Sequence, residues 1–81
     1  MSREEIVETL ISLCAKTYRK NAADLSEATT FAEDLKGPSV LFVGLTSLIE
    51  SECDVMLSIT EAAGAKTIGE LADLVFSRQG E

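Results

Sequence analysis

Apolar side chains recur at three- and four-residue steps in three separate stretches of this 81-residue chain. The stretches cover about residues 3–19, 39–53 and 68–77. This spacing places the apolar groups on one face of an α-helix, so each stretch predicts an amphipathic helix. A chain of this size has room for one domain only, so we expect residues 1–81 to form a single unit around one core.

Residues that favour helix ends occur beside these stretches. Ser2 can cap the first helix, and Thr67 with Glu70 has the pattern of a capping box for the last one. The segment from Ser58 to Gly64 predicts a single helical turn between the second and last helices. We therefore predict an all-α fold, a four-helix bundle with three main helices and one short third helix. Residues 78–81 are expected to fray at its end.

Residues 21–38 interrupt the helical pattern and predict a long loop between the first and second helices. Leu25, Phe31 and Leu35 are isolated apolar residues that can anchor this loop to the domain. Loops of this length are uncommon in small domains and are often functional. A plain connector, held by the same three side chains, remains the alternative interpretation.

The composition argues against several classes of function. Fourteen acidic and seven basic residues give a net charge of -7, so we expect no nucleic-acid partner. The chain has no histidine, and Cys14 and Cys53 are far apart, so neither a metal site nor a catalytic site is expected. We predict that the protein is not an enzyme and that both thiols lie in the core.

The sequence does not resemble that of a membrane or exported protein. Its longest apolar run, residues 40–49, is about half the length of a membrane-spanning helix. The first residues do not have the cationic and apolar regions of a secretory signal. We expect a cytoplasmic protein that does not insert into membranes.

Ser39 stands at the start of the second periodic stretch. It follows Gly37 and Pro38 and precedes a run of apolar residues, where a short hydroxyl side chain can satisfy free backbone amides. We expect the second helix to extend from about Ser39 to Cys53. Its core-facing positions are Phe42, Leu45, Ile49 and Cys53, with Leu41 and Leu48 beside them.

Two aliphatic residues next to Ser39 do not belong to that core-facing stripe. At about 100° per residue, Val40, Val43 and Ser47 point to the side of the helix opposite Leu45. Exposed aliphatic side chains in this place indicate a docking surface for another protein. The alternative, that the long loop folds over them, remains open at this point.

The order of these elements resembles that of the acyl carrier protein family over almost the whole chain. Residues 34–40 read Asp-Leu-Lys-Gly-Pro-Ser-Val, where the family typically has Asp-Leu-Gly-x-Asp-Ser-Leu. Residues 50–55 read Glu-Ser-Glu-Cys-Asp-Val and resemble the acidic end of the family's second helix. Residues 67–71 resemble its closing Thr-(Val/Ile)-Gly-(Asp/Glu)-Leu pattern. The resemblance implies that Ser39 carries a 4'-phosphopantetheine arm.

Ser47 is the alternative attachment residue, because residues 44–48 also resemble the Gly-x-Asp-Ser-Leu step. That choice leaves too few positions before Asp54 for the second helix of the family. It also places the attachment point in the middle of a helix, where we expect it to be buried. The positive dipole at the start of the helix can accommodate a phosphodiester at Ser39, which is therefore preferred.

The resemblance implies a carrier that holds an acyl group as a thioester on the arm and acts as a monomer. Its partners would be a phosphopantetheinyl transferase and enzymes that load and process the acyl group. Four residues are candidates for docking these partners: Val40, Val43, Glu50 and Glu52. Five are candidates for an acyl pocket, although each also suits an ordinary core: Phe31, Phe42, Leu45, Ile49 and Ile59.

This chain departs from the family pattern at three positions. Pro38 replaces an aspartate that in the family assists the magnesium-dependent transfer of the arm from coenzyme A. Leu41 and Gly44 replace acidic residues that are common on the second helix of fatty-acid carriers. These changes suggest a specialised fatty acid, polyketide or related biosynthetic pathway. The main alternative is an unmodified helical interaction module that has lost the arm.

Overall fold

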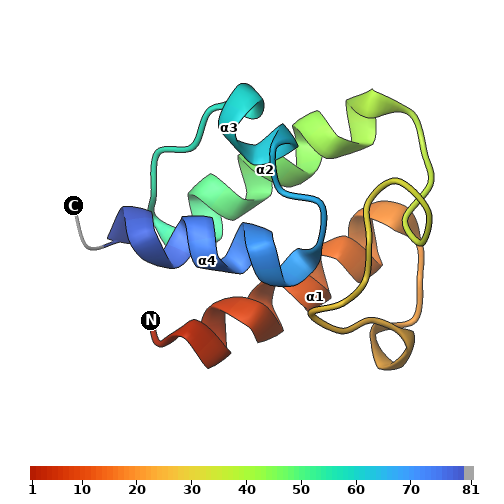
Figure 1. Ribbon diagram of the computed structural model, residues 1–81, viewed down its shortest axis with the longest axis horizontal. Coiled ribbons are helices and arrows are strands. Elements are labelled where there is room, and N and C mark those ends of the chain that lie inside the picture. Colours follow the sequence, from red (N-terminus) through yellow and green to blue (C-terminus); the bar gives the residue numbers. More distant parts are fainter. Residues whose placement is uncertain (80–81) are drawn as a thin grey trace.

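The computed structural model describes residues 1–79, and these form four α-helices, one short 3₁₀ helix and no extended strand. The five elements are α1 (Arg3–Tyr18), η1 (Ala22–Asp24), α2 (Ser39–Cys53), α3 (Ile59–Ala63) and α4 (Ile68–Gln79). The long loop joins the end of α1 to the start of α2 on one side of the molecule (Figure 1). The predicted all-α, four-helix architecture is confirmed.

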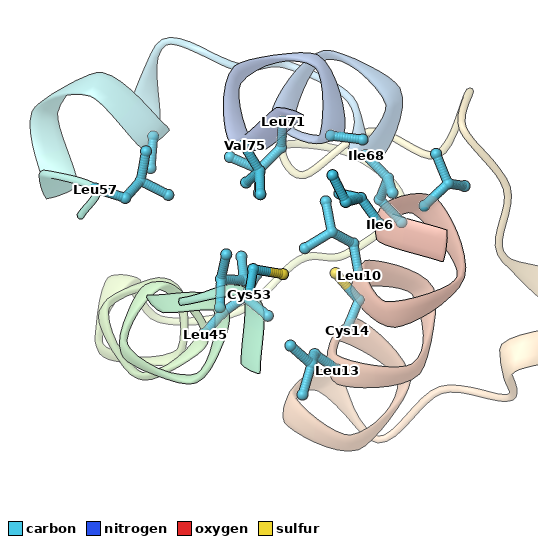
Figure 2. Packing of buried hydrophobic residues seen from close by; sticks show 14 of the residues in the cluster. Ile6, Leu10, Leu13, Cys14, Leu45, Cys53, Leu57, Ile68, Leu71 and Val75 are labelled. Carbon is cyan, nitrogen blue, oxygen red and sulfur yellow. The ribbon is translucent and has the colours of Figure 1, made fainter. Parts of the chain in front are cut away.

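One hydrophobic core lies between the three long helices, and α1 packs against both α2 and α4. Figure 2 shows side chains from these helices pointing toward a shared centre. The core residues with no exposed surface on the three helices are Ile6, Leu10, Cys14, Leu45, Ile49, Ile68, Leu71, Ala72 and Val75. None of the helices that the structure describes has the length and apolar character needed to cross a bilayer.

Side chains at the starts of α1 and α4 form the expected caps. At α1, the Glu5 amide donates to the Ser2 hydroxyl (3.2 Å), and the Ser2 amide donates to the Glu5 carboxylate (2.9 Å). At α4, the Glu70 amide donates to the Thr67 hydroxyl (3.1 Å). These hydrogen bonds satisfy amides that have no partner within the helix, so they fix where α1 and α4 begin.

The long loop is held to the start of α4 by backbone hydrogen bonds. The Ile68 amide donates to the Thr29 carbonyl (3.0 Å), and the Gly69 amide donates to the Glu27 carbonyl (2.9 Å). A Cβ atom on Gly69 would lie 3.1 Å from that Glu27 oxygen, so the close approach favours glycine. Among the expected apolar anchors only Leu35 is fully buried. Backbone pairing thus contributes to the position of the loop.

The end of α4 differs from the sequence prediction. Arg78 and Gln79, expected to fray, belong to the helix. Arg78 forms an ion pair with Glu61 of α3, and the Gln79 side chain donates a hydrogen bond to the Cys53 carbonyl (3.1 Å). These contacts come from distant parts of the chain, so periodicity alone did not reveal them. The other two residues of the predicted frayed tail lie outside the described part of the chain.

The buried face of α2 also differs from the prediction at two positions. Leu48, placed beside the core stripe, is 42% exposed, whereas Thr46 is 1% exposed. The Thr46 hydroxyl donates to the Phe42 carbonyl one turn earlier (2.9 Å), which satisfies a polar group that would otherwise be costly to bury. The core-facing stripe is therefore rotated toward Thr46 and away from Leu48.

Candidate functional site

Ser39 is the first residue of α2, and its side chain is exposed. The expectation that its hydroxyl caps the helix is wrong, because Pro38 occupies the cap position and the helix start has no side-chain cap hydrogen bond. A hydroxyl one position inside the cap is poorly placed to reach the amides of the first turn. The hydroxyl of Ser39 is therefore available at the surface for chemistry by another protein.

A pocket of about 590 Å³ borders Ser39. Its wall is built from the long loop, the first turns of α2, the short helix α3 and the end of α1. The rings of Phe31 and Phe42 meet edge to face in this wall, with their centroids 5.4 Å apart. Ile59 and Ala63 of α3 contribute further apolar surface. The site thus combines an exposed hydroxyl with an adjacent hydrophobic cavity.

The structure brings together three of the five residues considered for an acyl pocket. Phe31, Phe42 and Ile59 line the pocket beside Ser39. Leu45 and Ile49 lie in the core with no exposed surface and do not contribute to the pocket wall. Side-chain spacing showed that these two residues face inward, but it did not distinguish the closed core from the open pocket.

Sequence reasoning did not assign Tyr18 to the site. It lines the pocket from the last turn of α1, and burial raises the pKa of its hydroxyl above the ordinary value. A Cβ atom on Gly37 would lie 3.4 Å from the Tyr18 ring and 2.8 Å from the Leu41 side chain. Glycine therefore lets the loop pass closely between the end of α1 and the start of α2. The only signal for Tyr18 in the sequence was its place as the last apolar residue of the first helix.

The outer face of α2 is exposed beside the site. Val40 and Val43 are 68% and 46% exposed, so the long loop leaves these side chains accessible. A Cβ atom at Gly44 would have no neighbour within 4 Å, and Ser47 is also exposed. The expected burial of Ser47 is wrong, because the face opposite Leu45 remains open. Ser47 nevertheless lies in the interior of α2, two turns from the pocket wall at Ser39.

The acidic candidates are not at the Ser39 end of α2. Glu50 and Glu52 are 11 and 13 residues further along the helix, or about 17–20 Å at 1.5 Å per residue. The Glu50 carboxylate accepts a hydrogen bond from the Leu57 amide (3.3 Å) and so helps to hold the connection to α3. Glu52 is exposed. The first turn of α2 has no acidic residue.

Cys14 and Cys53 are buried and free, as expected for core thiols. Their sulfur atoms face each other across the core in Figure 2. Burial raises the pKa of the Cys14 thiol to about 12 and also raises that of Cys53. Both groups are therefore protonated and poorly reactive at neutral pH. Residues 1–79 contain no group of three or more side chains arranged to hold a metal ion.

Comparisons of the sequence with known proteins identify the family. The family model described as a phosphopantetheine attachment site matches residues 8–75. An acyl carrier protein of Lactobacillus acidophilus is 30% identical over 80 residues, which cover 99% of this chain and 100% of the relative. An acyl carrier protein of Chlamydia felis is 30% identical over 81 residues, covering 100% of both chains. The chain therefore belongs to the acyl carrier protein family, which bears a phosphopantetheine attachment site.

Proposed function

We propose that this protein carries acyl intermediates as thioesters on a 4'-phosphopantetheine arm esterified to Ser39. Membership of the family implies the prosthetic group. The observation that supports Ser39 as its attachment point is an exposed hydroxyl at the first position of α2, beside an apolar pocket. When bound, the arm supplies the thiol that holds the acyl group, and the protein itself acts as a carrier and not as a catalyst.

The residues around Ser39 fit such a group. The start of α2 carries the positive end of the helix dipole and has no acidic residue in its first turn, which favours a phosphodiester anion. The pocket has a volume within the range of about 300–1,000 Å³ that suits small ligands. Phe31, Phe42 and Ile59 supply the surface that excludes water from an apolar cargo, while Leu45 and Ile49 support that surface from the core.

The outer face of α2 is the proposed contact surface for partner enzymes. Val40 and Val43 offer apolar contact next to Ser39, and the carboxylates of Glu50 and Glu52 lie at the other end of the helix. The partners are a phosphopantetheinyl transferase and the enzymes that load and process the acyl group. The protein works as a cytoplasmic monomer. The apolar surface next to Ser39, without an acidic residue in the first turn of α2, supports a specialised fatty acid, polyketide or related pathway.

Intact mass spectrometry tests the attachment residue. Incubation with coenzyme A and a broad-specificity phosphopantetheinyl transferase should add the mass of one phosphopantetheine to the wild-type protein. Ser39→Ala should abolish the gain, because it removes the accepting hydroxyl. The matched control is Ser47→Ala, which removes an equally exposed hydroxyl from the same helix and should retain the gain.

Two results would contradict the proposal. Loss of the mass gain in Ser47→Ala but not in Ser39→Ala would move the attachment point to Ser47. No gain with several transferases, in the wild type and in Pro38→Asp alike, would indicate an unmodified module. Pro38→Asp belongs in the experiment because it restores a carboxylate before Ser39 and so separates a poor transferase substrate from a protein without an arm.

A further inference from the structure

The charged residues near Ser39 do not share the strong negative balance of the whole protein. The chain has a net charge of -7, yet Lys36 is the single charged residue between positions 35 and 49. Glu52, at the other end of α2, is about 20 Å away at 1.5 Å per residue. Charges at that distance are largely screened at about 0.1 M salt, where the Debye length is about 10 Å. The local residues therefore determine the potential at Ser39.

Lys36 is held close to the first turn of α2. The next residue, Gly37, packs so tightly against this turn that a Cβ atom would lie 2.8 Å from the Leu41 side chain. Lys36 itself is exposed, and within residues 1–79 its ammonium group has no ion-pair partner. The preceding acid, Asp34, uses its carboxylate to accept hydrogen bonds from the amide (2.9 Å) and hydroxyl (3.2 Å) of Thr30.

Lys66 approaches the same pocket from the connection between α3 and α4. It lines the pocket that borders Ser39, and its carbonyl accepts a hydrogen bond from the Phe31 amide (3.1 Å), which fixes its backbone at the wall. Its side chain is exposed and, in the part of the chain described, forms no ion pair. In the pocket wall, Lys66 is balanced by one acidic residue, Glu33, and Lys36 lies just outside this wall.

We infer that Lys36, assisted by Lys66, holds the phosphodiester of the arm against the start of α2. The inference rests on the proposed attachment at Ser39. Lysine binds phosphate groups as a point charge, and the positive end of the helix dipole acts in the same direction. The arm is then attached beside two lysines that form no ion pair within residues 1–79, although the molecule as a whole repels anions. Lys36 is a positioning residue for the arm and takes no part in acyl transfer.

The stability of the protein before and after loading tests the inference. The arm adds a negative charge, so loading should raise the melting temperature at about 0.01 M salt by about 2–6 °C. The rise should largely disappear at about 1 M salt, where the Debye length is about 3 Å. In Lys36→Gln, the rise in melting temperature on loading should be smaller by roughly half or more. Lys66→Gln should reduce the rise by less, and Lys36→Arg, which keeps the positive charge, should retain it.

Lys16→Gln is the matched control, since it removes the same charge from an exposed position on α1. Lys16 borders a different hollow, shared with Glu8 and Glu52, so the rise should match that of the wild type. The side-chain ¹⁵N signal of Lys36, but not that of Lys16, should shift on loading. These readouts do not depend on any activity of the loaded carrier.

Each contrary outcome is distinct. A normal mass gain with no rise in melting temperature would overturn the inference and leave the attachment at Ser39 intact. A rise in melting temperature that persists in high salt would show that packing of the arm causes it, and would overturn the inference. A rise that Lys16→Gln and Lys36→Gln reduce equally would show that net charge causes it, and would also overturn the inference. No mass gain at all would overturn the proposed function and this inference with it.

Discussion

Thr17 and Thr46 both bury a hydroxyl group inside a helix, but their hydrogen bonding differs. The Thr46 hydroxyl donates to the Phe42 carbonyl, whereas the Thr17 hydroxyl has no hydrogen-bond partner among residues 1–79. A buried hydroxyl without a partner costs about 1–3 kcal/mol of desolvation. The two threonines look alike in the sequence, but the hydroxyl of Thr46 stabilises the fold and that of Thr17 destabilises it.

Replacement by the isosteric valine should reveal this difference. Thr17→Val removes an unsatisfied polar atom, so the free energy of unfolding should rise by about 1 kcal/mol. Thr46→Val breaks a hydrogen bond and should lower it by about 0.5–1.5 kcal/mol. Urea denaturation of both variants measures the two values. A loss of stability in Thr17→Val would mean that its hydroxyl has a partner after all.

The long loop and the two terminal helices are joined by a charged cluster as well as by backbone hydrogen bonds. The Arg3 guanidinium of α1 donates to Glu27 in the loop (2.5 Å) and to Asp73 of α4 (2.6 Å). The hydrogen bond from Arg3 lowers the pKa of Glu27, and the two carboxylates raise that of Arg3. More than a third of each of the three side chains is exposed, so salt screens the cluster and its contribution is modest.

The cluster predicts how stability depends on pH. Because the pKa of Glu27 is lower in the folded protein, its contribution is present above the unfolded value of about 4.3 and is lost as the pH falls further. Arg3→Gln should therefore flatten the fall in melting temperature between about pH 5 and pH 3. The matched control Arg19→Gln lies outside the cluster and should keep the wild-type slope. Identical slopes in all three proteins would show that the cluster is not formed in solution.

At the scale of the whole molecule, the two thiols report on the core. Cys14 lies on α1 and Cys53 on the last turn of α2, and both are buried where these helices pack together. Cys14 has no exposed surface and Cys53 is 3% exposed, so we expect a reagent to reach either sulfur mainly when the helices separate. The raised pKa of Cys14, about 12, further lowers its thiolate fraction.

Alkylation rates should follow global unfolding. In the native protein both thiols should react about 10³-fold or more slowly than in denaturant, given the usual stability of small domains. Mass spectrometry of iodoacetamide-treated protein gives the two rates separately. Rapid modification of one cysteine in the folded state would show that its helix opens independently.

The sequence predicted the features of this molecule that depend on residues close to one another along the chain. Helix periodicity and the caps at Ser2 and Thr67 correctly placed the helices, and the start of α2 agreed with the predicted position of Ser39. The pairing of the loop with α4 and the participation of Tyr18 in the pocket depend on residues distant in sequence. Such contacts leave no periodic signal, and only the assembled fold revealed them.

The hydrogen bond between the Phe31 amide and the Lys66 carbonyl links two walls of the pocket. Together with the hydrogen bonds from the Ile68 and Gly69 amides, it joins the loop to the start of α4 and to the connection before it. The five-residue helix α3, which contributes Ile59 and Ala63 to the pocket, is tied to α4 by the side-chain ion pair between Glu61 and Arg78. For the acyl group proposed to enter this pocket, breaking that one ion pair would be the first step in making room for a longer chain.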